Sequence, residues 1–400
     1  MTSADWDSTQ TGNRLGPLLA MIVTGIAGAS MMIIMPGVLS ALASIRGWSN
    51  SEVAILAATE MAGIGFGTFG SALIVARINR RALGCVALVV VIAAHLASAY
   101  SGELLAFLGS RFVAGSAEGV LIAVMTASIA GTMHPDRNFA IYMASNLAIS
   151  TLLLTILRLF IGTGAPQFIF FVLCAIDAIA LVLLQLLPGS PAAEREAPSG
   201  ESLWHMSSVL GLLATLLLFI GIGATWPLVG QIGVVHGLPA KFIATALSVA
   251  TFMGIVSGLI VSALGTNVGR SGPILIGTTF LMLGMLGLKF ANGPVVFAFV
   301  VGSYLFFWVF IVPYYTGVMS ALDPGGRMAS FSMAMQFIGL TLGPLIVSPM
   351  LRGHSLSSAI WMGVAICPPA ITMMLVAERR LRVAQLEQQV LTASREEGAA

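Results

Sequence analysis

Long apolar stretches separated by short polar segments run through the whole chain. Because the hydrocarbon core of a bilayer is about 30 Å thick, about 20 helical residues are enough to cross it. Stretches of this length are too long and too apolar for the strands of a membrane β-barrel. The sequence therefore predicts an all-α membrane protein. Twelve spanning helices are expected, near residues 15–43, 51–76, 82–100, 103–131, 138–162, 166–187, 205–234, 240–265, 272–290, 294–321, 328–350 and 356–377.

One polar segment is longer than the others and divides the predicted helices into two groups of six. This segment, residues 188–204, is rich in proline, serine and charged residues, as exposed linkers are. We expect a first six-helix bundle in residues 1–187, a cytoplasmic linker in 188–204, a second bundle in 205–377 and a cytoplasmic tail in 378–400. The tail is polar and helix-prone, so we expect it to be solvated or to lie on the membrane surface.

The two halves resemble each other at one offset. Arg137, which closely follows the fourth predicted helix, corresponds to Arg327 after the tenth, and a proline precedes each of them. Arg80, in the loop after the second helix, corresponds to Arg270 after the eighth. Both pairs are about 190 residues apart, which indicates a duplicated unit and hence two pseudo-symmetric bundles.

The charged residues are few and unevenly placed. They make up 8% of the chain, against 58% hydrophobic residues, whereas soluble domains contain about 25% charged residues. If both termini are cytoplasmic, twelve Lys and Arg residues lie on the inner side and five on the outer side. Because cytoplasmic loops carry the excess of positive charge, we expect a multi-pass protein of the cell inner membrane with both termini inside. A net charge of +2 gives no indication of nucleic-acid binding.

No pattern in the sequence indicates an enzyme. The chain lacks a glycine-rich phosphate loop followed by Lys-Ser/Thr, a His-Glu-x-x-His motif and a nucleophile elbow. Its three cysteines, Cys85, Cys174 and Cys367, lie in or beside apolar stretches without metal-ligand spacing, as small buried residues do. We therefore expect neither catalysis nor a cofactor or metal.

The fourth predicted helix carries two charged residues inside its apolar stretch. Arg111, Gly115, Glu118 and Gly119 are spaced i, i+4, i+7 and i+8, so they share one face of the helix. A charge near the bilayer centre costs roughly 2.5–3.5 kcal/mol on insertion scales and is kept where it faces a partner or a water-filled path. We interpret this face as lining a transport path.

Other ionisable residues lie within the predicted helices. Glu60 is expected at the same depth as Arg111, because the second and fourth helices enter the membrane from the same side. An ion pair between them would lower the cost of burial and would serve either proton coupling or the packing of the helices. Glu118 and Asp177 are further candidates for proton coupling, with a structural role as the alternative. His95 is expected to be a neutral, buried histidine, with a role in proton transfer as the alternative.

The second half offers aromatic and amide side chains instead of charges. Tyr304, Trp308 and Tyr315 share one face of the tenth helix, at spacings i, i+4 and i+11. Gln336 lies in the eleventh helix and Trp226 in the seventh. Tyrosine and tryptophan in the middle of a span, rather than at the interfaces, indicate a surface for a ligand, with packing as the alternative.

Two six-helix halves, a basic loop after the second helix and an Arg-x-x-x-Gly-x-x-x-Gly face in the fourth resemble the major facilitator superfamily. The loop in that family is similar to Gly-x-Leu-x-Asp-Arg-x-Gly-Arg-Arg. The matching segment here, residues 72–81, keeps the arginines as Arg77, Arg80 and Arg81, but has Ala76 in place of the aspartate. The resemblance implies that this loop braces one conformation and that the arginine of the fourth helix takes part in proton coupling.

The resemblance also bears on the direction of transport. The glycine-proline run typical of the fifth helix in drug antiporters is absent, because Ser145–Leu157 contains neither residue. Proton-driven efflux of lipophilic compounds nevertheless stays an alternative, since Met31, Met32 and Met35 would suit loose recognition. A non-transporting receptor built on a transporter fold is a second alternative.

The main hypothesis is a proton-coupled secondary transporter working by alternating access, either as a symporter or in export. We expect the first half to carry the proton and the second half to supply aromatic contacts to the substrate. With Arg111 added as a substrate-binding residue, such a cavity suits a small organic anion, for example an aromatic or other carboxylate. The expected partners are this solute, H⁺ as the coupling ion and the lipid bilayer, and the protein is expected to be a monomer.

Overall fold

A computed structural model describes residues 15–72, 78–130, 132, 135–187, 205–265, 268–322, 327–352 and 355–397. Within this part of the chain nearly every residue is helical, and twelve helical segments are long and apolar enough to cross a membrane. The predicted all-α fold with twelve spans is therefore confirmed.

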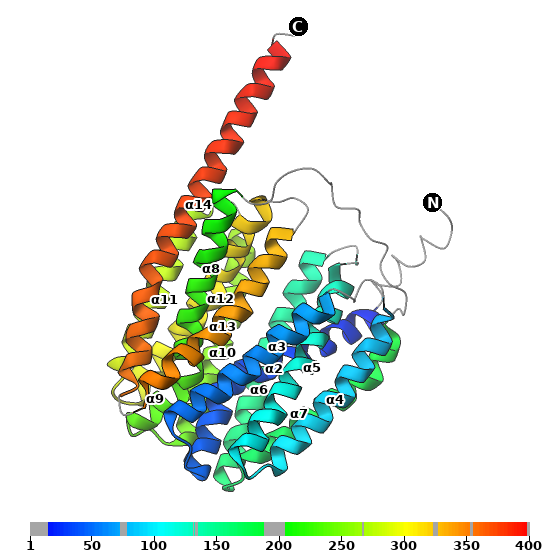
Figure 1. Ribbon diagram of the computed structural model, residues 1–400, viewed down its shortest axis with the longest axis vertical. Coiled ribbons are helices and arrows are strands. Elements are labelled where there is room, and N and C mark those ends of the chain that lie inside the picture. The colour runs from blue at the N-terminus through cyan, green and yellow to red at the C-terminus, as the bar shows by residue number, and fades with distance from the viewer. Residues whose placement is uncertain are drawn as a thin grey trace.

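Figure 1 shows two bundles of helices side by side. The first bundle contains α2 (Leu15–Arg46), α3 (Asn50–Ala72), α4 (Arg80–Tyr100), α5 (Leu104–Ala130), α6 (Pro135–Gly162) and α7 (Ile169–Leu183), the last flanked by 3-10 turns η1 (Pro166–Phe168) and η2 (Leu184–Leu186). The second contains α8 (Met206–Thr225), η3 (Trp226–Leu228), α9 (Val229–Val235), α10 (Ala240–Leu264), α11 (Ser271–Lys289), α12 (Pro294–Leu322), α13 (Arg327–Met350) and α14 (Ser357–Glu397). The seventh span consists of α8, η3 and α9 in succession.

Local sequence sets several helix boundaries. The side chain of Asn79 accepts a hydrogen bond at 3.1 Å from the Ala82 amide and so caps the start of α4. Gly47 follows α2 with a φ of 71°, which residues with a side chain rarely adopt. Pro227 lacks a backbone donor and lies in the 3-10 turn that interrupts the seventh span. By contrast, α12 continues as one helix through Pro313.

Equivalent helices pack together in the two bundles. In the first, α3 packs on α5, and α4 packs on both α5 and α7. In the second, α10 packs on α12, and α11 packs on both α12 and α14. Each helix thus has a counterpart about 190 residues later, which confirms the two pseudo-symmetric bundles.

The bundles contact each other through α3 with α13 and through α6 with α10. The hydroxyl groups of Ser51 and Ser348 lie 2.9 Å apart at the ends of α3 and α13 that are remote from the start of α2. The hydroxyl groups of Thr151 and Thr251 lie 2.6 Å apart between α6 and α10. We call the end of the molecule that holds Ser51 and Ser348 the far side, and the end from which α14 projects the terminal side. Figure 1 shows the two bundles diverging toward the terminal side.

Helix α14 runs unbroken from Ser357 to Glu397, through the boundary predicted between residues 377 and 378. Its last part projects beyond both bundles (Figure 1). Glu378 fixes the start of this part, because it accepts hydrogen bonds from Arg382 at 2.6 Å and from Ser271 of α11 at 2.5 Å. The tail is helical, as predicted.

Glycines allow α3 and α5 to pack backbone against backbone. On each helix two glycines are spaced four residues apart, and a Cβ atom on any of them would meet a backbone atom of the other helix: Gly63, Gly67, Gly115 and Gly119. For Gly63 that atom is the Phe112 carbonyl oxygen, at 2.5 Å. Such Gly-x-x-x-Gly pairs let membrane helices approach closely, and here they bring Glu60 of α3 within reach of the charged residues of α5.

The substitution Gly119→Ala should lower the apparent melting temperature of the purified protein in detergent. The added Cβ would meet the Ile64 carbonyl oxygen, and overpacking of this kind costs about 1–3 kcal/mol. Gly109→Ala is the control on the same helix, because its Cβ would meet nothing within 4 Å, and it should leave the melting temperature unchanged or raise it. Equal melting temperatures for the two variants would contradict the close packing.

Candidate functional site

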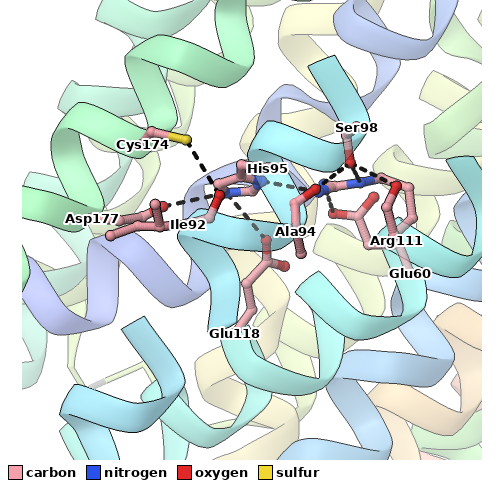
Figure 2. Close-up of polar contacts among 10 residues, drawn as sticks. Glu60, Ile92, Ala94, His95, Ser98, Arg111, Glu118, Cys174 and Asp177 are labelled. Atoms are coloured by element: carbon pink, nitrogen blue, oxygen red, sulfur yellow. Dashed lines mark hydrogen bonds and ion pairs between the residues drawn. The ribbon is translucent and has the colours of Figure 1, made fainter. Parts of the chain in front are cut away.

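A connected network of ionisable side chains lies inside the first bundle (Figure 2). It consists of Glu60 on α3, His95 on α4, Arg111 and Glu118 on α5, and Asp177 on α7. Each of these residues is at most 1% exposed. The four residues predicted for proton coupling therefore lie together, and His95 joins them as a fifth member.

Arg111 is the centre of this buried network. Its Nη1 donates to Glu60 Oε1 at 3.3 Å, its Nη2 to His95 Nδ1 at 2.9 Å, and its Nε to Ser98 Oγ at 3.0 Å. Its Cζ atom also lies 5.0 Å from the centre of the Phe170 ring, within cation–π distance. The predicted Glu60–Arg111 ion pair is thus confirmed, and each nitrogen of the guanidinium has a partner.

The contact with Arg111 fixes the tautomer of His95. A guanidinium has donors and no acceptor, so Nδ1 accepts and the ring proton must lie on Nε2. That nitrogen lies 3.5 Å from Asp177 Oδ2 and 3.8 Å from Glu118 Oε1. The imidazole is therefore neutral, as expected, and lies between a cation on one edge and two carboxyl groups on the other.

The network contains more acids than bases. If its three carboxyl groups were all ionised, they would face one guanidinium and a neutral imidazole, which leaves two uncompensated negative charges. Such charges are very costly inside a protein. The buried network is neutral only when two carboxyl groups hold a proton. Because Glu60 contacts Arg111 directly, we assign these protons to Glu118 and Asp177.

The equivalent positions of the second bundle carry no charged residues. An offset of 190 residues places His95 on Met285 and Asp177 on Cys367. These two counterparts are also in contact, since Cys367 Sγ lies 4.0 Å from Met285 Sδ. A thiol and a thioether thus occupy the positions that hold the imidazole and the carboxyl group in the first bundle.

The remaining counterparts in the second bundle are uncharged as well. The same offset relates the residues of the α3–α5 pair to buried apolar or aromatic residues of the α10–α12 pair: Ala250, Val301 and Trp308 for Glu60, Arg111 and Glu118. Equivalent helices therefore pack in the second bundle with no ion at any of the five positions. Helix packing alone does not require the charges of the first bundle, which favours a functional role for them.

The structure corrects one interpretation of the sequence. The face of α5 that holds Arg111, Gly115, Glu118 and Gly119 does not line a transport path in this conformation. Its glycines pack on the backbone of α3, and its charged side chains are at most 1% exposed. The face is covered because glycines admit a neighbouring helix and because the charges find partners within the bundle. Binding of substrate by Arg111 stays a prediction that this conformation does not support.

Three of the predicted aromatic residues form a cluster where the bundles meet. Trp226 stacks on Tyr304, with ring centres 5.6 Å apart, and meets Trp308 edge-on at 5.5 Å. The indole Nε1 of Trp226 donates to the Met32 carbonyl oxygen of α2 at 3.4 Å. The cluster belongs to the second bundle, and its tryptophan contacts the first.

The other two predicted substrate residues lie apart from this cluster. The hydroxyl group of Tyr315 is 3.3 Å from that of Thr278 on α11, inside the second bundle. Gln336 on α13 is half-buried, and its carboxamide has no hydrogen-bond partner among the described residues. Gln336 therefore keeps free hydrogen-bonding groups, whereas Tyr315 has an internal partner.

The basic loop after α3 is described only in part. Arg77 lies outside the described residues. Arg80 donates to the Ala127 carbonyl oxygen of α5 at 3.2 Å, and Arg81 donates twice to the Leu187 carbonyl oxygen. Both arginines thus tie together ends of helices within the first bundle. Their role in bracing one conformation stays a prediction.

Two members of the site were not predicted from the sequence. Ser98 lies one helical turn after His95 and accepts from Arg111, and this i, i+3 spacing was the available signal. Phe170 covers the guanidinium from α7, a contact between helices far apart in the sequence that no local pattern reveals.

A family model described as Major Facilitator Superfamily matches residues 20–348. The chain belongs to the major facilitator superfamily. No curated protein sequence matches it.

Solved structures of other transporters share this superfamily fold. The nucleoside transporter NupG (D323A mutant) is 10% identical, with 92% of this chain and 99% of that chain covered and a TM-score of 0.72. The xylose transporter XylE from E. coli, in a partially occluded inward-open conformation, is 14% identical, with coverages of 90% and 98% and a TM-score of 0.72. A D-xylose-proton symporter is 14% identical, with coverages of 88% and 96% and a TM-score of 0.68. At these identities the likeness shows the fold.

The variant Asp177→Cys, which places the residue of the second bundle at this position of the first, should fold with little change in melting temperature in detergent. Asp177 is not among the partners of Arg111, so the guanidinium keeps all of them, and His95 Nε2 keeps Glu118 at 3.8 Å. Arg111→Met is the comparison and should lower the melting temperature, because removing one partner of a buried pair costs about 3–5 kcal/mol. An Asp177→Cys protein that fails to fold would show that this carboxyl group is needed for packing.

Proposed function

We propose that this protein is a proton-coupled secondary transporter that moves a small organic solute across the cell inner membrane by alternating access. Membership of the superfamily supports secondary transport. The observation that carries the proton coupling is the buried network in which three carboxyl groups face one guanidinium. That network is neutral only while two carboxyl groups are protonated.

Proton coupling follows from the cost of charge in this interior. Loss of a proton from Glu118 or Asp177 leaves a net negative charge among residues that are at most 1% exposed. The protein can carry that charge only in a conformation that admits water or a compensating cation. Proton binding and conformation are thereby linked. One fold neighbour is named as a D-xylose-proton symporter, which agrees with coupling to protons.

The aromatic cluster is the proposed substrate contact. In this conformation Trp226 donates its indole N–H to Met32 of the first bundle. Opening of the far side separates the bundles and frees both this donor and the face of the ring. Stacking on such a ring suits a solute that itself contains a ring, and the two neighbours are named for a nucleoside and for xylose, which both do.

We infer that the solute is a small ring-bearing compound, and that it is either the carboxylate expected from the sequence or a neutral compound. An anion has one requirement that a neutral solute does not have. Arg111 must leave Glu60, His95 and Ser98 before it can bind a carboxylate. A neutral ring-bearing solute needs only the aromatic cluster and a hydrogen-bonding side chain such as Gln336.

Efflux of lipophilic compounds is the second candidate and has less support. It was suggested by the methionines of the first span, but Met31 and Met35 are at most 2% exposed and Met32 is half-buried. They therefore offer little surface for loose recognition. A receptor that does not transport is favoured by no contact in the described structure.

Addition of the transported solute to proteoliposomes should drive protons across the membrane, as reported by a trapped pH-sensitive dye. Nucleosides, sugars, carboxylates and lipophilic amines form the first panel, and an imposed pH gradient should drive accumulation of the active compound. Asp177→Asn and Glu118→Gln should abolish accumulation but keep exchange of solute for solute, because they remove the proton site alone.

Cys367→Ala is the matched control for the acid variants, because Cys367 is the counterpart of Asp177 in the second bundle. It should accumulate solute at the native level. Accumulation driven by a sodium gradient and indifferent to pH, or native accumulation by Asp177→Asn, would refute proton coupling through this network.

The variant Trp226→Phe should bind the active solute about two- to tenfold more weakly, because it keeps a stacking ring and loses one N–H donor. The measurement is the dissociation constant obtained from thermal shifts of the purified protein. Phe280→Leu removes an aromatic ring of α11 that is 47% exposed and stacks on Phe307 away from the cluster, so it is the control. Equal affinities for Trp226→Phe and the native protein would exclude the indole N–H as a solute donor.

A further inference from the structure

We propose that His95 is a proton relay to Glu118 and Asp177, and that Arg111 holds this relay interrupted in the conformation described. The inference rests on the proposed proton coupling and names the residue through which protons reach the acids. The sequence left His95 as a neutral buried histidine or a residue of proton transfer, and the inference specifies the transfer step and the side chain that blocks it.

The two nitrogens of the imidazole face different parts of the bundle (Figure 2). Nε2 faces the acids, with Asp177 Oδ2 at 3.5 Å and Glu118 Oε1 at 3.8 Å. Nδ1 faces Arg111 at 2.9 Å. A relay needs one atom to receive a proton while another gives one away, and the two ring nitrogens of His95 supply such a pair between Arg111 and the acids.

Hydroxyl groups continue from the Nδ1 side toward the far side. Ser98 Oγ accepts from Arg111 Nε at 3.0 Å and lies 2.8 Å from Ser110 Oγ. Ser98 is two residues before the far-side end of α4 at Tyr100. Glu118 lies seven residues beyond Arg111 along α5, or about 10 Å closer to the terminal side. The imidazole therefore separates the far-side hydroxyl groups from the acids.

Charged or titratable groups reach His95 from each of the helices around it. Helix α5 contributes Arg111 and Glu118, α7 contributes Asp177, and α3 contributes Glu60 through its bond to Arg111. The Cys174 thiol of α7 is nearby but is bound to the Ile92 carbonyl oxygen at 3.6 Å. Among these groups, Arg111 alone contacts the nitrogen that must receive the proton.

The relay step is a pair of proton transfers. A proton from the far side binds Nδ1 and gives the imidazolium, and the proton on Nε2 then passes to the carboxylate of Asp177 or Glu118. The ring is left neutral with its proton on Nδ1. In that tautomer it presents a donor to Arg111, so the Arg111–His95 hydrogen bond re-forms only after water admitted by the open far side has taken the proton from Nδ1 and given one to Nε2.

Arg111 blocks this step because its Nη2 donates to the one lone pair that could accept the incoming proton. Protonation of Nδ1 would also place two cations 2.9 Å apart in a buried site. Proton transfer through His95 is thus blocked while the bundles are in contact at the far side. The relay opens when Arg111 moves, and protons do not leak through the first bundle without a conformational change.

The test measures proton leak in proteoliposomes that contain no solute. A potassium diffusion potential drives protons inward, and a trapped dye reports the rate. Arg111→Gln should raise the rate about tenfold or more, the population change expected for loss of a charged hydrogen bond. Arg111→Gln/His95→Asn should return to the native rate, because an asparagine amide cannot pass a proton. Cys174→Ala, next to the network, should keep the native rate.

Two results would overturn the relay. One is a folded Arg111→Gln protein that leaks no faster than the native protein, and the other is a double variant that leaks as fast as Arg111→Gln. Should Arg111→Gln fail to fold, nitrogen NMR of histidine-labelled native protein gives an independent answer, with the His95 signal assigned by its loss in His95→Asn. The relay requires a protonated Nε2 and an unprotonated Nδ1, and a protonated Nδ1 would contradict it.

The leak measurement separates the relay from the proposed function. Native protein that accumulates solute on a pH gradient, together with a leak that does not depend on His95, would refute the relay alone. Native protein that shows no such accumulation would refute proton-coupled transport, whatever the leak of the variants.

Discussion

An ionised side chain inside a membrane protein must be compensated, and this constraint shapes the whole first bundle. Arg111 has a partner on each of its nitrogens, and Glu60 and His95 take two of them. Glycines allow α3 and α5 to pack closely enough for these contacts to form. The acids still outnumber the cation, so protons must supply the remaining compensation. A proton-holding site thus follows from the same contacts that make the charges tolerable.

The second bundle has the same arrangement of helices but different residues at these positions. Met285 and Cys367 occupy the places of His95 and Asp177, and they meet without any charge. The aromatic cluster around Trp226 lies in this uncharged bundle, so the proposed proton and solute sites are on different bundles. Helix α3 connects them, since it contributes Glu60 to the network and packs on α13 of the second bundle. Coupling through α3 needs no direct contact between proton and solute.

The sequence was sufficient for the spans, the duplication and the Glu60–Arg111 pair, because apolar length, repeat offset and depth in the membrane are all local or additive quantities. It was not sufficient to show which neighbouring helix each side chain contacts. The periodicity of α5 shows that Arg111 and Glu118 share a face, but not which helix covers that face. His95 is the clearest case, since a lone histidine in an apolar span has no pattern that reveals two acids on neighbouring helices. Such contacts depend on how helices far apart in the sequence pack.

The central claim is that buried carboxyl groups of the first bundle are protonated when the far side is closed. Infrared difference spectroscopy of the purified protein at neutral pH tests this directly, because a protonated carboxyl group absorbs apart from a carboxylate. The account predicts a protonated-carboxyl band that loses intensity in Glu118→Gln and again in Asp177→Asn, and is unchanged in Cys367→Ala. A spectrum without that band, or a band indifferent to both acids, would contradict it.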